Sequence, residues 1–139
     1  MRPPALLLLS LLSLSSGLGS AAPTAGFLTP AQLQTALSAR ARGQQHFTLV
    51  NVHIPYQGHI EGTDVSVPYD VIGQKDGLYS RALPADKAAP LILYCRSGNM
   101  SAQAHTTLNQ LGYTNVRELK GGFDAWKEAG YPLRVKVRF

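Results

Sequence analysis

The chain has 139 residues, of which 45% are hydrophobic, and a formal net charge of +5 at pH 7. This length suits one domain with a single hydrophobic core and leaves no room for a second domain of ordinary size. The basic excess is mild, and no run interleaves basic with aromatic residues, so the composition does not indicate nucleic-acid binding.

Residues 1–21 have the organisation of a secretory signal peptide. Arg2 supplies a positive charge, residues 5–14 are apolar apart from serines, and small residues precede the expected cleavage site after Ala21. We therefore expect residues 22–139 to be the mature domain of an exported protein, periplasmic or secreted, with no stable membrane anchor. The apolar stretch is shorter than the ~20 residues of a membrane-spanning helix. An uncleaved N-terminal anchor is the alternative interpretation.

The first elements of the mature domain are predicted to be a helix and a strand. Thr29 can cap a helix whose first position suits Pro30, and Gly43 provides a stop. Residues 47–54 are rich in β-branched and aromatic side chains, which favours a strand ended by Pro55.

The middle of the chain is punctuated by turn-forming residues. Residues 55–64 predict a loop, and residues 65–67 predict a short strand. The segment 70–90 contains several glycines and prolines and predicts only one short helix, near residues 85–88.

The second half alternates strands and helices. Residues 91–94 form an apolar run without alternation, which is typical of a strand buried on both faces. Helices are predicted over 101–111 and 121–129, with a short strand over 115–119 between them and an edge strand or extended tail over 133–139. This alternation predicts an α/β domain with a mainly parallel sheet.

Cys95 is the only cysteine of the chain. It cannot form an intramolecular disulfide and there is no C-x-x-C motif, so it is an inert buried thiol, an intermolecular partner or a reactive group. Its position directly after the strand 91–94 points to the last of these, because ligands of α/β sheets bind beyond the carboxyl ends of the strands.

The residues that follow Cys95 favour its thiolate form. Arg96 adds a positive charge, the start of the next helix adds a partial one, and Gly98 can adopt the backbone angles of a tight turn. Ser97 and Ser101 can donate hydroxyl hydrogen bonds or cap the helix. Because the thiolate is the nucleophilic form of cysteine, the loop predicts a reactive site. A buried cysteine before an ordinary turn is the alternative.

The segment YCRSGNMSAQA, residues 94–104, resembles the active-site loop of rhodanese-like sulfurtransferases. GHI at residues 58–60 and LGYTNVRELKGGFDAWKEAGYPL at residues 111–133 are similar to other parts of that family, in the same order. The resemblance implies a three-layer domain with a mainly parallel five-stranded sheet and helices on both faces. It also implies transfer of a sulfane sulfur from a donor such as thiosulfate, through a Cys95 persulfide, to a thiol or cyanide.

The same resemblance implies roles for the residues of the loop. Cys95 is expected to be the nucleophile, and the donor is expected to bind Arg96, Ser97, Gly98, Asn99, Met100 and Ser101. No metal or organic cofactor is expected, because the protein carries the sulfur covalently. His53 is expected at the rim of the pocket, and the histidines have no standard metal-ligand spacing.

Three positions depart from the family pattern. Asn51 and His53 stand where aspartate and arginine are frequent, so an ion pair that braces the loop is in doubt. Met100 stands where arginine is frequent, which makes the expected pocket less cationic and more suited to an apolar or thiol-bearing acceptor.

Two other functions use a cysteine loop of this kind. A phosphatase or arsenate reductase of the C-x5-R type requires an arginine six positions after the cysteine to bind a tetrahedral dianion, and Ser101 stands there instead, which disfavours both. A non-catalytic binding or persulfide-carrier module remains open, because the departures at Asn51 and His53 are compatible with weakened catalysis.

Overall fold

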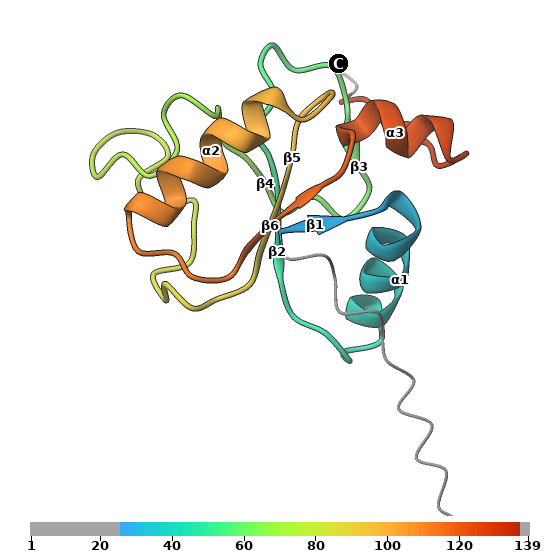
Figure 1. Cartoon of the computed structure of the whole chain (residues 1–139), viewed down its shortest axis with the longest axis horizontal. Coiled ribbons are helices and arrows are strands. Elements are labelled where there is room, and N and C mark those ends of the chain that lie inside the picture. The colour runs from blue at the N-terminus through green and yellow to red at the C-terminus, as the bar shows by residue number, and fades with distance from the viewer. Residues whose placement is uncertain (1–25, 137–139) are drawn as a thin grey trace, which may run out of the picture.

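The computed structural model describes residues 26–136, and its central feature is a five-stranded sheet (Figure 1). The strands lie in the order β1-β6-β5-β2-β4, and every neighbouring pair is parallel. They are β1 (Phe27–Leu28), β2 (Thr48–Asn51), β4 (Val65–Ser66), β5 (Leu91–Tyr94) and β6 (Val116–Leu119). The expected α/β class with a mainly parallel five-stranded sheet is confirmed.

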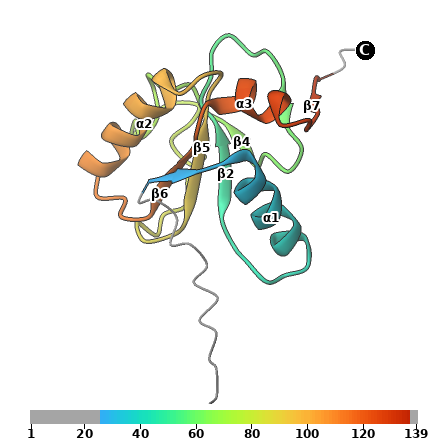
Figure 2. The same cartoon turned by 45° about the vertical axis from the view of Figure 1, so that its right-hand side comes forward.

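Helices cover both faces of the sheet, which makes three layers (Figure 2). The helices are α1 (Pro30–Ala41), α2 (Asn99–Gln110) and α3 (Gly122–Glu128). Alternate side chains of a strand enter different cores: Leu49 packs with residues of α1 and α3, whereas Val50 packs with residues of α2. Because helices cover both faces, β5 is fully buried, as its uninterrupted apolar run predicts.

The start of α1 confirms the predicted cap. The Thr29 hydroxyl accepts a hydrogen bond from the Gln32 N–H at 3.2 Å, and the Gln32 side chain accepts one from the Thr29 N–H at 2.9 Å. Two backbone donors that a helix start leaves unpaired are thereby satisfied.

A second, two-stranded sheet holds the C-terminal segment. In it, β3 (His59–Ile60) pairs antiparallel with β7 (Leu133–Arg134). The strand predicted over 133–139 is therefore much shorter than expected within the described chain, and residues 137–139 lie outside it.

The Tyr94 hydroxyl connects this small sheet to the central strand β5. It accepts a hydrogen bond from the Ile60 N–H at 3.0 Å and lies 2.7 Å from the Thr63 hydroxyl. Burial raises the pKa of Tyr94 to about 12, against a weaker lowering by the Thr63 and Ile60 contacts. The neutral phenol is therefore the form that fits this position.

Some predicted boundaries were wrong. Residues 85–88 form no helix, because the Asp86 carboxylate accepts a hydrogen bond from the Ala88 N–H at 2.9 Å and holds the backbone in a turn. The strand predicted over 47–54 ends at Asn51, and β1 was not predicted. The helix predicted over 121–129 is confirmed at Gly122–Glu128.

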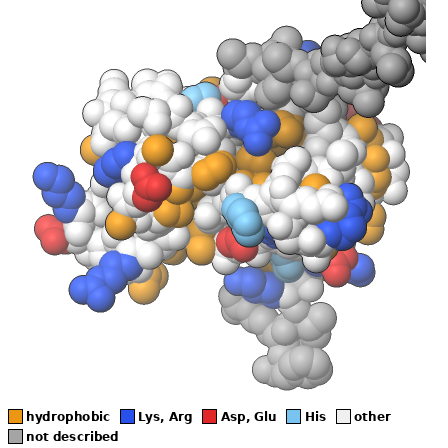
Figure 3. Space-filling view, turned by 90° about the horizontal axis from the view of Figure 1, so that it is seen from below, with side chains coloured by type: hydrophobic (Ala, Val, Ile, Leu, Met, Phe, Trp, Pro, Cys, Tyr) orange, Lys and Arg blue, Asp and Glu red, His pale blue; other side chains and the backbone are white. Residues whose placement is uncertain are grey.

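The surface and the termini bear on the other expectations. None of the helices within residues 26–136 is long and apolar enough to span a membrane. The face shown in Figure 3 has basic, acidic and apolar side chains interspersed. The signal peptide expected over residues 1–21 lies outside the described residues.

Candidate active site

Cys95 lies at the carboxyl end of β5, which is the middle strand of the parallel sheet. In Figure 1 this is the upper end of β5, where the chain turns into α2. The residue is only 2% exposed and belongs to the core cluster under α2. The sheet thus places the thiol at the edge where α/β domains bind ligands.

Gly98 of the following turn and Ser101 of α2 both contact the Cys95 sulfur. The Gly98 N–H donates a hydrogen bond to Sγ at 3.0 Å, and the Ser101 hydroxyl oxygen lies 3.5 Å from Sγ. Ser101 in turn donates to the Gly98 carbonyl at 3.1 Å. Because the Ser101 hydroxyl hydrogen goes to the Gly98 carbonyl, the Ser101 oxygen accepts from the Cys95 thiol. The Gly98 N–H is therefore the group of this network that can hold negative charge on the sulfur.

Gly98 supplies the geometry of this turn. Its φ is +124°, a backbone conformation that residues with a Cβ rarely adopt, and no atom lies within 4 Å of the place where a Cβ would stand. Glycine is thus required here by its backbone angles and not by lack of space.

α2 begins at Asn99, two residues before its predicted start, so that Asn99 and Met100 belong to its first turn. No side chain among residues 26–136 caps this helix. The unpaired N–H groups and the partial positive charge of the helix start therefore face the end of the sheet where Cys95 lies.

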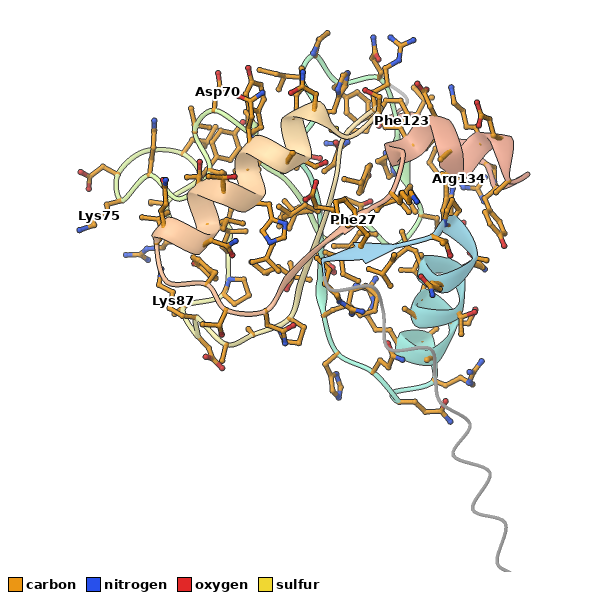
Figure 4. All side chains as sticks on the ribbon, viewed as in Figure 1. Phe27, Asp70, Lys75, Lys87, Phe123 and Arg134 are labelled. Atoms are coloured by element: carbon orange, nitrogen blue, oxygen red, sulfur yellow. The ribbon has the colours of Figure 1, made fainter. Side chains whose placement is uncertain are left out.

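α3 braces the loop from the other face of the sheet. The Phe123 N–H donates to the Cys95 carbonyl at 2.9 Å, and the Asp124 N–H donates to the Arg96 carbonyl at 3.0 Å. Figure 4 labels Phe123 at the start of this helix, beside the turn between β5 and α2. The amides of the first turn of α3 thus fix the backbone of the nucleophile and of its neighbour.

Gly122 makes this approach possible. A Cβ at Gly122 would lie 2.3 Å from the Cys95 carbonyl oxygen and 2.4 Å from that of Arg96, and its φ is +59°. Both space and backbone angle therefore require glycine. Sequence reasoning did not assign this role, although the Gly121-Gly122 doublet before an apolar helix was its visible signal.

A cavity of about 180 Å³ opens at the loop, lined by His53, Cys95, Arg96, Ser97, Asn99 and Met100. These six expected site residues therefore lie together around the cavity. The other two, Gly98 and Ser101, do not line it but contact the Cys95 sulfur. Their roles in a reaction stay predictions. A larger cavity of about 460 Å³ lies between α1 and Trp126 and contains no cysteine. The nucleophile makes the smaller cavity the better candidate.

Asn51 and His53 occupy the side of the site contributed by β2. Asn51 is buried, its side-chain amide donates to the Gly58 carbonyl at 3.1 Å, and its carbonyl accepts from the His53 N–H at 3.0 Å. The His53 ring contacts Phe123 edge-on, with ring centroids 5.3 Å apart, and its Nε2 lies 3.1 Å from Gln57. Hydrogen bonds of the Asn51 side chain thus hold residues 51–58, at the place where other family members frequently have an aspartate and an arginine.

The other assigned histidines have partners of their own. His59 Nδ1 lies 2.6 Å from the Tyr56 hydroxyl, and His105 Nδ1 lies 2.9 Å from the buried carboxylate of Glu118. Within residues 26–136, no group of three or more histidine, cysteine, aspartate or glutamate side chains is arranged to hold a metal ion.

Fold and site together define the class of this protein. It is an α/β domain in which main-chain amides hold a buried cysteine at the end of the central strand. The family model of the rhodanese-like domain matches residues 34–129, so the chain belongs to this family.

Named relatives agree with this family. The chain is 30% identical over 111 residues to the probable adenylyltransferase/sulfurtransferase MoeZ of Mycobacterium tuberculosis, a match of 78% of this chain but 26% of that protein. It is 32% identical over 85 residues to the chloroplastic thiosulfate sulfurtransferase 16 of Arabidopsis thaliana, which covers 57% of this chain and 70% of that one.

Solved structures agree as well. A rhodanese-related protein from Thermoplasma volcanium superimposes with a TM-score of 0.61 at 26% identity, over 80% of this chain and 99% of that one. The family and its sulfurtransferase relatives support sulfur transfer in general terms.

Proposed function

We propose that the protein is a sulfurtransferase that takes a sulfane sulfur from a donor such as thiosulfate and passes it to a thiol or cyanide. The observation that carries this proposal is the Gly98 N–H, which donates at 3.0 Å to Sγ of Cys95, a residue that lines the cavity of about 180 Å³. A fixed main-chain donor stabilises negative charge both on a thiolate and on the persulfide formed from it.

The proposed reaction has two displacement steps. The Cys95 thiolate attacks the outer sulfur of thiosulfate, a new S–S bond forms, the donor S–S bond breaks, and sulfite leaves with the electron pair. The acceptor then attacks the outer sulfur of the Cys95 persulfide, and the Cys95 thiolate leaves. Arg96, which lines the cavity, is the proposed contact for the sulfonate end of the donor. The sulfur is carried by the protein itself, so the proposal includes no cofactor.

Intact-mass spectrometry after incubation with thiosulfate tests this proposal. We expect a gain of one sulfur atom that a reducing thiol reverses and that Cys95→Ser abolishes. An unchanged mass with thiosulfate and also with 2-hydroxyethyl persulfide, in protein whose Cys95 reacts with a small alkylating agent, would contradict it.

A persulfide carrier or binding module is the second candidate. It is favoured by the departures at Asn51 and His53, where Asn51 makes neutral hydrogen bonds to the Gly58 carbonyl and from the His53 N–H. A thiosulfate:cyanide assay separates the two functions. Steady turnover that disappears in Cys95→Ser supports the enzyme, whereas one stoichiometric loading without turnover supports the carrier.

We also propose that the protein is exported, on the basis of the signal-like pattern of residues 1–21. A single cysteine suits an oxidising compartment, because a second one would compete for the thiol that carries sulfur. N-terminal sequencing of the protein from its native cell tests this, with a start at Ala22 expected and an intact Met1 contrary to it.

A further inference from the structure

Among residues 26–136, Arg96 is the only lysine or arginine that lines the cavity at Cys95, and it already has a carboxylate partner. Its Nε lies 3.4 Å from Asp124 Oδ2, and the side chain is 57% exposed. The Asp124 N–H also donates to the Arg96 carbonyl at 3.0 Å, so main chain and side chain both keep Asp124 beside Arg96. Asp124 Oδ1 also lies 3.9 Å from Lys127 Nζ, but Lys127 does not line the cavity. The permanent cation that does line it is thus partly neutralised before any donor binds.

The rest of the cavity wall, as far as the described part of the chain forms it, provides no other permanent positive charge. Met100 contributes a thioether that packs against the core cluster under α2, and the His53 ring packs against Phe123. Ser97 and Asn99 are neutral hydrogen-bonding residues. A sulfur donor must therefore be held by main-chain amides, by these neutral side chains and by the Arg96 guanidinium, which also contacts Asp124.

Donor charge decides how strongly Asp124 matters. The Coulomb energy between a fixed carboxylate and a donor is proportional to the charge of the donor. Thiosulfate has two negative charges, whereas the persulfide of a small neutral thiol has at most one. The carboxylate therefore opposes thiosulfate about twice as strongly, in free energy, as it opposes the persulfide.

We propose that Asp124 determines donor specificity: by pairing with Arg96 it disfavours a dianionic donor, and the site prefers thiol-derived persulfides to thiosulfate. This inference rests on the proposed sulfur transfer. In the loading step the Cys95 thiolate attacks the outer sulfur of R–S–SH, and the new S–S bond forms as the donor S–S bond breaks. The leaving RS⁻ keeps the electron pair and takes the proton of the outer sulfur, which leaves RSH and a Cys95 persulfide anion.

Loading rates of Cys95 from two donors test the role of Asp124. The second-order rate constant for gain of one sulfur is measured by intact mass with thiosulfate and with 2-hydroxyethyl persulfide, at an ionic strength of about 0.01 M. The variant is Asp124→Asn. The matched control is Glu128→Gln, because Glu128 lies on the same helix, is exposed, and forms no ion pair within residues 26–136.

We expect the wild type to load faster from the persulfide. Asp124→Asn should raise the thiosulfate constant about 5-fold and the persulfide constant about 2-fold, and these gains should vanish at about 1 M salt. Glu128→Gln should change both constants less than 2-fold. Met100→Arg, which adds a cation without a partner, should likewise raise the thiosulfate constant selectively.

The proposal is overturned if the wild type loads faster from thiosulfate, if Asp124→Asn changes both donors equally, or if Glu128→Gln reproduces its effect. If Asp124→Asn does not fold, Asp124→Ser, which also removes the carboxylate, is measured in its place and must show the same selective gain for thiosulfate. If the wild type gains no sulfur from thiosulfate and none from the persulfide, the proposed function itself is wrong. If it loads from at least one donor but lacks the effects of Asp124, only the specificity role is wrong.

Discussion

Replacement of Gly122 by alanine should damage both stability and sulfur loading. The added Cβ would lie 2.3 Å from the Cys95 carbonyl oxygen, and real Cβ contacts are essentially never shorter than 3.0 Å, so α3 or the Cys95 loop must move. The positive φ costs about 1–2 kcal/mol in a residue with a Cβ. Weakening of the Phe123 and Asp124 amide bonds to the loop costs about 1 kcal/mol each. We therefore expect a loss of about 3 kcal/mol in the free energy of unfolding.

Urea unfolding and the loading rate constant of Cys95 together measure this effect. A displacement near 1 Å at the nucleophile can reduce a rate about 100-fold, so loading should fall on that scale in protein that is still folded. Gly130→Ala is the matched control, because Gly130 has φ +90° but no atom within 4 Å of its missing Cβ. The free energy of unfolding of Gly130→Ala should fall by only about 1–2 kcal/mol, and its loading rate constant should equal that of the wild type. Equal stability and equal loading in the two variants would refute the role assigned to Gly122.

Two further predictions concern the contacts of the loop and of β5. Gly98→Ala forces a Cβ into φ +124° and should turn the N–H away from Cys95 Sγ, which lowers the loading rate constant about 10-fold or more; unchanged loading would show that this amide is dispensable. Tyr94→Phe leaves the Ile60 N–H without its partner and should cost about 1–3 kcal/mol in urea unfolding at pH 7. The folded-state pKa of Tyr94 is raised from 10.0 to about 12. The contribution of this hydroxyl to the free energy of unfolding is therefore fully present below pH 10 and is lost as the pH rises toward 12. Wild type should therefore lose more stability than Tyr94→Phe over that range, and parallel pH profiles would contradict the assignment.

Local patterns predicted much of the fold. The Thr29 cap formed as expected, because its hydrogen bonds with Gln32 span only three residues. The apolar run of β5 predicted a strand buried on both faces, and the cysteine directly after it had to lie at the carboxyl edge of the sheet. These features depend on residues adjacent in the chain, so a single sequence was enough.

One element was missed because it depends on a distant partner, and two other predictions were changed by the geometry of nearby residues. β1 has two residues and exists because it pairs with β6, so its own sequence contains little signal. The early start of α2 follows from the backbone of Gly98, which caps the helix without a side chain. At residues 85–88 a local competitor, the Asp86 carboxylate, overcame the expected helix.

The sequence by itself determined the class of the domain, the position of Cys95 at a strand end, and the glycine-containing turn behind it. Only the tertiary structure decided what surrounds that thiol. Gly122 meets the Cys95 carbonyl, and Asp124 meets Arg96 across 28 positions of the chain, because α3 folds back over the end of β5. Neither contact follows from periodicity or composition, since each depends on where two separately formed elements dock.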